Sequence, residues 1–236
     1  LLDADPQSAV LVIDTTLSMR YRGVFAAALA EANDFMDNLG PGDEVAIVVL
    51  GERATVLTDF TDEPAALRRA LDSLTEPSFG ASSIRSGLAL ADEMLAAATF
   101  ENRSITLLSD FQATGADGLE GSWKLAPGVA FTPIDVGVEE TQNLTVVDVR
   151  VPATLIDGIQ ADPVLARIRS SGSLPVERAQ VSLLIDGEVI ERAAVELTDV
   201  SEKVVEFAYI LEGSGERAIE VRVQGDDFID DNSRYA

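Results

Sequence analysis

The sequence predicts an α/β domain with a mostly parallel, doubly wound sheet, followed by an all-β sandwich. In the first part of the chain, short apolar runs alternate with stretches of helical periodicity, as in a sheet that helices cover on both faces. After residue 141 the helical periodicity ends, and strands of alternating polarity follow one another with turn residues between them. We therefore expect two domains, residues 1–140 and residues 141–236.

The strands of the first domain are predicted from apolar runs, and the helices from apolar residues that recur every three or four positions. In chain order we expect a strand at 9–14, a helix at 21–39, strands at 44–50 and 54–58, helices at 62–74 and 84–98, and strands at 104–109 and 129–136. The turn at Gly51-Glu52 is too short for a crossover, so the strand after it is expected to run antiparallel. Pro64 begins the second helix, and Ser82 or Ser83 caps the third.

The second domain is predicted from six strands without helical periodicity between them. These strands are expected at 146–151, 164–169, 180–185, 189–197, 203–211 and 217–223. The dipeptide Asp186-Gly187 between two apolar strands is a good hairpin signal, because both residue types tolerate the positive φ of tight turns. About 90 residues of this pattern are typical of an immunoglobulin-like sandwich.

The composition excludes several classes of function. Lys and Arg total 17 and Asp and Glu total 41, so the formal net charge is −24, which argues against nucleic acid and an anionic membrane surface as partners. Cys and His are both absent, which excludes disulfides, thiolate metal sites, His-based acid–base catalysis and the usual zinc sites. No apolar run reaches the length of a membrane helix, and we expect membrane attachment only through segments outside this sequence.

Three separated segments offer carboxylates and hydroxyls at the ends of predicted strands or in loops. They are Asp14-Thr15-Thr16-Leu17-Ser18, Gly80-Ala81-Ser82-Ser83 and Ser109-Asp110. In open, mostly parallel sheets, ligands bind at the carboxyl ends of the strands, where Asp14 and Asp110 fall. Hard divalent cations prefer oxygen ligands, and Mg²⁺ in particular takes a few protein oxygens and keeps several waters. The segments therefore favour a metal-dependent binding site over a catalytic centre.

These segments resemble the metal site of the von Willebrand factor A domain family, which has a Rossmann-like fold, and the resemblance covers residues 9–138. The family pattern is Asp-x-Ser-x-Ser, then a Thr in a Gly-rich loop, then an Asp that ends a later strand. Asp14, Thr16 and Ser18 match the first element, while Ser82 and Asp110 stand at the second and third. The resemblance implies a site for Mg²⁺, or for Mn²⁺ or Ca²⁺, in which these five residues are ligands directly or through water.

A closer resemblance is to membrane-anchored, Bat-type (aerotolerance-related) bacterial proteins. It is carried by Ser109-Asp110-Phe111-Gln112, by the β-sandwich that follows, and by the acidic tail at 225–232. It implies a non-enzymatic, extracytoplasmic module that binds a partner protein, whose Asp or Glu carboxylate completes the coordination of the metal. An AAA+ ATPase system is a further partner that the resemblance implies. Phe111 stands where many family members carry Gly and can narrow the mouth of the site.

Two other functions remain open. A structural or assembly module with a vestigial metal site would show no dependence on metal. A phosphatase with Asp14 as nucleophile would need a second acid where Thr16 stands, and a lysine that only Lys124 or Lys203 could supply. Local structure can also explain the motif, because Thr16 and Ser18 can cap a helix.

The acidic tail is a second candidate for metal binding. It contains four carboxylates that could bind Ca²⁺: Asp226, Asp227, Asp230 and Asp231. The Asp-x-Asp-x-Asp-Gly spacing of a calcium loop is missing, so the simpler interpretation is a solvated acidic turn.

Overall fold

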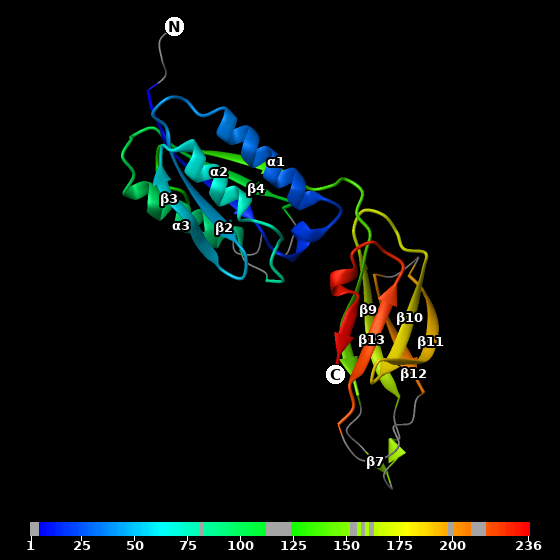
Figure 1. Ribbon diagram of the computed structural model, residues 1–236. Coiled ribbons are helices and arrows are strands. Elements are labelled where there is room, and N and C mark those ends of the chain that lie inside the picture. Colours follow the sequence, from blue (N-terminus) through cyan, green and yellow to red (C-terminus); the bar gives the residue numbers. More distant parts are fainter. Residues whose placement is uncertain are drawn as a thin grey trace. The chain divides into compact units, whose positions relative to one another are not determined.

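The chain forms two compact units, the first ending at Val138 and the second beginning at Glu139 (Figure 1). This computed structural model describes residues 5–80, 83–111, 124–151, 155–156, 159–160, 163–197, 201–208 and 216–236. Within these ranges, no helix is both long and apolar enough to cross a membrane.

A five-stranded sheet in the order β3-β2-β1-β4-β5 forms the centre of the first unit. Its strands are β1 (Ser8–Asp14), β2 (Glu44–Leu50), β3 (Ala54–Thr61), β4 (Arg103–Ser109) and β5 (Val129–Asp135). The pairs β1–β2, β1–β4 and β4–β5 are parallel, and β2–β3 is antiparallel, as the short turn predicts. All seven residues of β1 are buried, and the five between Ser8 and Asp14 form an unbroken apolar run.

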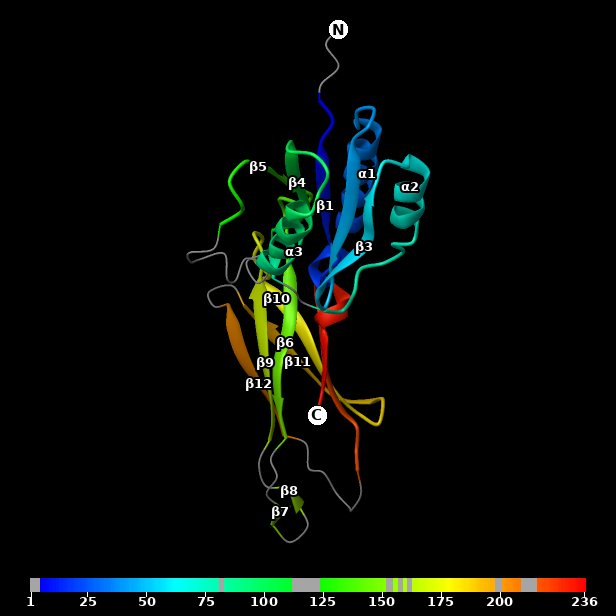
Figure 2. The same cartoon turned by 90° about the vertical axis from the view of Figure 1, so that its left-hand side faces the viewer.

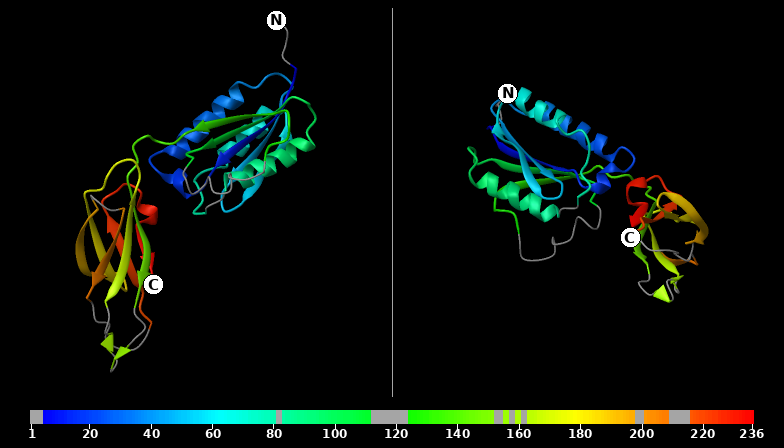
Figure 3. Two further views of the ribbon diagram at one scale, coloured as in Figure 1. Left: turned by 180° about the vertical axis from the view of Figure 1, so that it is seen from behind. Right: turned by 60° about the horizontal axis from the view of Figure 1, so that its bottom comes forward.

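Helices cover both faces of this sheet, so the predicted doubly wound fold is confirmed. In the right-hand view of Figure 3, α1 (Val24–Asp37) and α2 (Pro64–Asp72) lie on one face and α3 (Ile84–Ala96) lies on the other. Helix α3 buries Leu88, Ala91 and Leu95 against side chains of β1, β2 and β4. Ser83 caps α3, because its side chain accepts a hydrogen bond from the Ser86 N–H.

The start of α1 differs from the prediction of a helix from residue 21. Arg22 and Gly23 have φ values of 37° and 80°, a left-handed conformation that an α-helix cannot contain. The helix therefore begins at Val24, and a short 3₁₀ helix, η1 (Leu17–Arg20), precedes it. The apolar periodicity of residues 24–39 is compatible with a longer helix and does not reveal this break.

The second unit is the predicted β-sandwich (Figure 2). One sheet has the order β11-β10-β13-β14, the other has the order β12-β9-β6, and a two-stranded sheet pairs β7 with β8. Their bounds are β6 (Asn143–Arg150), β7 (Leu155–Ile156), β8 (Ile159–Gln160), β9 (Val164–Ser171), β10 (Arg178–Ile185), β11 (Glu188–Glu196), β12 (Glu202–Phe207), β13 (Ile219–Gln224) and β14 (Ser233–Tyr235). Asp186 and Gly187 have φ values of 52° and 85° and form the predicted hairpin between β10 and β11.

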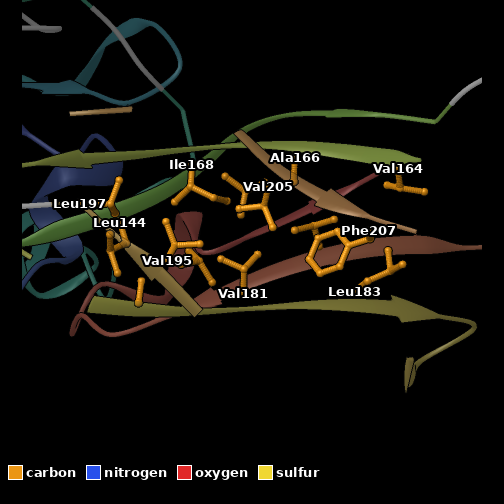
Figure 4. Close-up of a cluster of buried hydrophobic side chains, with 14 of the residues drawn as sticks. Leu144, Val164, Ala166, Ile168, Val181, Leu183, Val195, Leu197, Val205 and Phe207 are labelled. Atoms are coloured by element: carbon orange, nitrogen blue, oxygen red, sulfur yellow. The ribbon is translucent and has the colours of Figure 1, made fainter. Parts of the chain in front are cut away.

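The core of the sandwich consists of alternate residues from both of its larger sheets (Figure 4). Val181 and Leu183 of β10 point inward from one sheet, and Val205 and Phe207 of β12 point inward from the other. Since successive side chains of a strand point to opposite faces, this spacing of two explains the alternating polarity of the sequence. Strand β14 and the 3₁₀ helix η2 (Ile229–Asp231) carry no such alternation and were not predicted.

Glu44, the first residue of β2, connects the amino ends of β1 and β2 to the segment before β4 through hydrogen bonds. Its carboxylate accepts hydrogen bonds from Ser8 Oγ at 2.7 Å, from the Thr99 N–H at 2.8 Å and from Thr99 Oγ1 at 2.9 Å. Burial opposes ionisation of Glu44, but the hydrogen bonds from Ser8 and Thr99 outweigh it and hold its pKa below the ordinary value.

Glu44→Gln is therefore expected to lower the free energy of unfolding by roughly 0.5–1 kcal/mol at pH 7, a range that allows for screening by solvent. Because the pKa is lowered in the folded state, this stabilisation is present above the ordinary value of 4.5 and is lost as the pH falls through the lowered value. Urea unfolding of both proteins at pH 7 and in acid measures the difference. A difference that did not shrink in acid would contradict the assignment.

Candidate metal centre

The pairing of β1 with β4 places two Asp residues at one edge of the first sheet. Asp14 is the last residue of β1, and Asp110 directly follows β4. The two strands are parallel neighbours, and Ile13 lies opposite Leu108. Parallel strands end at the same edge, so the register brings together residues that are far apart in the sequence.

Hydrogen bonds connect four of the five predicted ligands. Asp14 Oδ1 accepts from the Thr16 N–H at 2.9 Å and from Thr16 Oγ1 at 2.7 Å. Thr16 Oγ1 lies 3.4 Å from Ser18 Oγ, which donates to Asp110 Oδ1 at 3.2 Å. Ser82, the fifth predicted ligand, lies outside the described residues. The structure therefore brings Asp14, Thr16, Ser18 and Asp110 into one continuous cluster.

Ser109 supports this cluster from inside the sheet, although the sequence indicates it only within the segment Ser109-Asp110 and not among the ligands. Its side chain is fully buried, and Ser109 Oγ donates to Asp14 Oδ2 at 2.6 Å. Ser109 Oγ also accepts a hydrogen bond from the Phe111 N–H at 3.1 Å. A lone Ser in an apolar strand carries no signature of its own, but the β1–β4 register identifies it, because Asp14 and Ser109 directly follow the last pair, Ile13 and Leu108.

A second set of contacts fixes the backbone between β1 and η1. Thr15 donates from both its N–H and Oγ1 to the Leu50 carbonyl, at 2.7 and 2.8 Å. The Thr15 carbonyl in turn accepts from the Ser78 N–H at 2.8 Å and from Ser78 Oγ at 2.9 Å. These bonds hold the first motif against the end of β2 and against the loop that leads to α3.

Gly80 lets the loop that leads to α3 approach the backbone of Glu52 closely. Its carbonyl accepts a hydrogen bond from the Leu17 N–H at 3.1 Å. A Cβ atom at position 80 would lie 2.7 Å from the Cα atom of Glu52, so a larger residue would displace the loop. The Gly of the predicted loop motif is therefore required by packing.

Phe111 follows Asp110 in a left-handed conformation with a φ of 47°. This backbone costs a non-glycine residue about 1–2 kcal/mol, which explains why Gly suits the position. The Phe111 side chain is half-buried and packs against the hydrophobic cluster beneath α3. Phe111 thus has a packing role, and its effect on the mouth of the site stays a prediction.

The chemistry of the cluster is that of hard oxygen donors. Asp14 is only 5% exposed, and no ion pair of the described residues involves it. Three hydrogen bonds, from Thr16 and Ser109, offset part of the cost of burying this carboxylate. No group of three or more acidic side chains that could hold a metal ion occurs among the described residues. The candidate centre instead combines two carboxylates with hydroxyl groups.

Comparison with known families identifies the first unit. Residues 9–112 match the family model of the von Willebrand factor type A domain. This segment is a von Willebrand factor type A domain. The matched residues run from β1 to just beyond Asp110 and thus include every predicted ligand. A comparison with curated proteins found no match.

Several solved structures are similar to the chain. One is the von Willebrand factor domain of a type V pili tip protein from Porphyromonas gingivalis, with 26% identity, a TM-score of 0.40 and coverage of 44% of this chain and 38% of that chain. Another is proximal thread matrix protein 1 from the mussel byssus with a zinc-occupied MIDAS motif, with 22% identity, a TM-score of 0.40 and coverage of 44% and 28%. A third is an aerotolerance-related membrane protein from Bacteroides fragilis, with 15% identity, a TM-score of 0.43 and coverage of 63% and 75%. The chain spans less than half the length of the first two.

Ser109→Ala is expected to lower the free energy of unfolding by about 1–3 kcal/mol, because it removes the only described donor to Asp14 Oδ2 inside the sheet. Denaturant unfolding measures this loss. Ser104→Ala is the matched control, since Ser104 lies on the same strand and its hydroxyl makes a longer, part-buried bond of 3.3 Å to Gln7. Equal losses in the two variants would show that the contact with Asp14 is not special.

Proposed function

We propose that the first unit is a protein-interaction module whose metal centre binds a carboxylate of its partner. The metal is Mg²⁺, or Mn²⁺ or Ca²⁺, and the ligands are Asp14, Thr16, Ser18, Ser82 and Asp110. The hydrogen bond of 3.2 Å between Ser18 and Asp110, which are 92 residues apart, is the observation that carries the proposal. Membership of the von Willebrand factor type A domain family supports a general role in protein interaction.

The hydroxyl groups of the cluster are oriented to serve as ligands. Thr16 Oγ1 donates its proton to Asp14, and Ser18 Oγ donates its proton to Asp110. A hydroxyl that donates its proton to a carboxylate keeps its lone pairs free to coordinate a cation. A bound divalent ion supplies a Lewis-acidic position, and Mg²⁺ retains waters that another oxygen ligand can replace. Thr16 and Ser18 would hold the ion, with Asp14 and Asp110 as direct or water-bridged ligands.

Charge balance favours an acidic partner. Two carboxylates neutralise a divalent ion, and the hydroxyl ligands add no charge. A carboxylate from outside can therefore approach the ion without facing a large excess of negative charge from the protein ligands. An Asp or Glu side chain of a partner protein would supply a further oxygen ligand to the ion.

Membrane anchoring and an AAA+ ATPase system remain predictions from the resemblance to Bat-type bacterial proteins. The similarity to an aerotolerance-related membrane protein is consistent with an extracytoplasmic module of a bacterial membrane protein. Catalysis by Asp14 has less support, because Thr16 occupies the position of the second acid. Lys124 precedes β5, and Lys203 belongs to β12, where its Nζ donates a hydrogen bond to the Glu196 carbonyl.

Asp110→Asn is expected to reduce the affinity for Mg²⁺ and Mn²⁺ at least about tenfold, because the substitution keeps the shape of the side chain and removes its charge. Isothermal titration calorimetry measures the affinity. Asp135→Asn is the matched control, since Asp135 is an exposed carboxylate at the end of the neighbouring strand β5. An unchanged affinity in Asp110→Asn would refute the assignment of the centre.

Metal-dependent binding separates the adhesion function from a structural module. We expect Mg²⁺ to raise the melting temperature of the chain above its value in EDTA, because a ligand that binds only the native state stabilises it. We also expect peptides with a central Asp to bind with Mg²⁺ and to lose binding with EDTA or when Asn replaces the Asp. No effect of Mg²⁺ in either experiment would favour the structural alternative.

A further inference from the structure

A second cluster of oxygen atoms lies in the sandwich, between the start of β6 and the segment that follows β13. Asp226 accepts hydrogen bonds from the Leu144 N–H at 2.5 Å and from Asn232 Nδ2 at 2.7 Å. Asp231 Oδ2 accepts from Asn143 Nδ2 at 2.9 Å and from Thr145 Oγ1 at 2.6 Å. Two carboxylates, two amides and a hydroxyl thus meet at one place.

This cluster contains three buried acceptors without a donor. Asn143 Oδ1, Asp231 Oδ1 and Asn232 Oδ1 are inaccessible to solvent and have no hydrogen-bond partner. Within the described ranges, no other buried side-chain nitrogen or oxygen atom lacks a partner. Asn232 as a whole is only 6% exposed. Because buried polar groups are normally paired, three orphan oxygens at one place call for a hydrogen-bond donor or a cation.

Two of the orphan oxygens belong to amides that contact the carboxylates, and the third is the second oxygen of Asp231 itself. Asn232 Nδ2 donates a hydrogen bond to Asp226 Oδ1, and Asn143 Nδ2 donates one to Asp231 Oδ2. Rotation of either amide by 180° would direct its oxygen at the carboxylate. Such a contact is repulsive without a cation and favourable around one.

The charges of the cluster are not balanced by basic residues. Burial raises the pKa of Asp226 despite its hydrogen bonds, and burial also raises the pKa of Asp231, with the charge of Asp226 adding to the effect. No ion pair of the described residues involves either carboxylate. A bound cation would supply the missing positive charge.

We propose that Asp226, Asp231, Asn143 and Asn232 bind a Ca²⁺ ion in the sandwich. Ca²⁺ accepts six to eight oxygen ligands in flexible geometry and readily combines carboxylates with amide oxygens, whereas Mg²⁺ demands a near-ideal octahedron and rarely uses an all-protein cage. Zinc sites favour Cys and His ligands, which the chain lacks.

This site corrects the interpretation of the acidic tail as a solvated turn. Asp227 and Asp230 are exposed, but Asp226 and Asp231 are partly buried and face β6. No calcium loop is visible in the sequence because the ligands come from two segments more than 80 residues apart, as the separation of 88 between Asn143 and Asp231 shows.

The ion would join the two large sheets of the sandwich. Asn143 begins β6 in the three-stranded sheet, whereas Asp226 and Asn232 flank β13 and β14 in the four-stranded sheet. Gly225, with a φ of 146°, turns the chain so that Asp226 reaches β6, and a Cβ there would lie 3.1 Å from Leu144 Cδ1. Occupancy of the site therefore links directly to the stability of the second unit.

The experiment uses the full chain with Asp110→Asn, so that a failure of the first metal centre does not affect the result. Calorimetry with CaCl₂ is expected to show one site. Adding Asp231→Asn should weaken binding at least about tenfold, because an Asn oxygen can still accept the bond from Thr145 but carries no charge. Asp230→Asn, an equal charge change at an exposed neighbour, should leave the affinity within about twofold.

A second measurement covers the case in which Asp231→Asn does not fold. In the unsubstituted chain, CaCl₂ should shift the side-chain amide resonances of Asn143 and Asn232, whereas MgCl₂ at the same concentration should shift them less. Absence of Ca²⁺ binding to the Asp110→Asn chain, or unchanged amide resonances, would overturn the proposal and leave water as the partner of the orphan oxygens. An equal loss of affinity in Asp230→Asn would also overturn it, because it would indicate a diffuse acidic surface.

Discussion

The parallel pairing of β1 with β4 is the constraint on which the candidate metal centre depends. It places Asp14 and Ser109 in contact inside the sheet and leaves Asp110, the next residue, beside Ser18 at the edge. Asp110 lies one residue beyond the end of β4, where its side chain contacts Ser18. A slip of β4 by one residue would exchange a buried hydroxyl for a buried carboxylate, which the apolar neighbours of β4 could not accommodate.

The clusters of side-chain oxygen atoms in the two units differ in their exposure to solvent. In the first unit, Asp110 and Ser18 are half-buried at the open edge of a sheet, where an external group can reach them. In the second unit, the Asn232 side chain and the orphan oxygens are shielded from solvent between strands. A position that solvent reaches suits recognition, whereas an enclosed position suits the cross-linking of two sheets. The absence of His and Cys is consistent with both, because hard cations need neither.

The elements with strong hydrophobic patterns were predictable from sequence, and those defined by backbone turns were not. The apolar run of β1 and the turn Asp186-Gly187 carry their own signals, and the motif of Asp14, Thr16 and Ser18 predicted a cluster that the structure contains. The start of α1 was not visible, because the left-handed φ of Arg22 leaves no trace in apolar spacing. Ser109, and the inward positions of Asp226 and Asp231, depend on strand register and on the 3₁₀ turn η2, which single residues do not encode.

Phe111 gives the edge of the first sheet a mechanical property. Its N–H donates a hydrogen bond to Ser109 Oγ, its backbone has a left-handed conformation, and its side chain packs against the hydrophobic cluster beneath α3. Any displacement of Asp110 by an incoming group would have to pull this ring from its apolar surroundings. The carboxylate of Asp110 is therefore preorganised, so a group that bound at this edge would meet it in its present position.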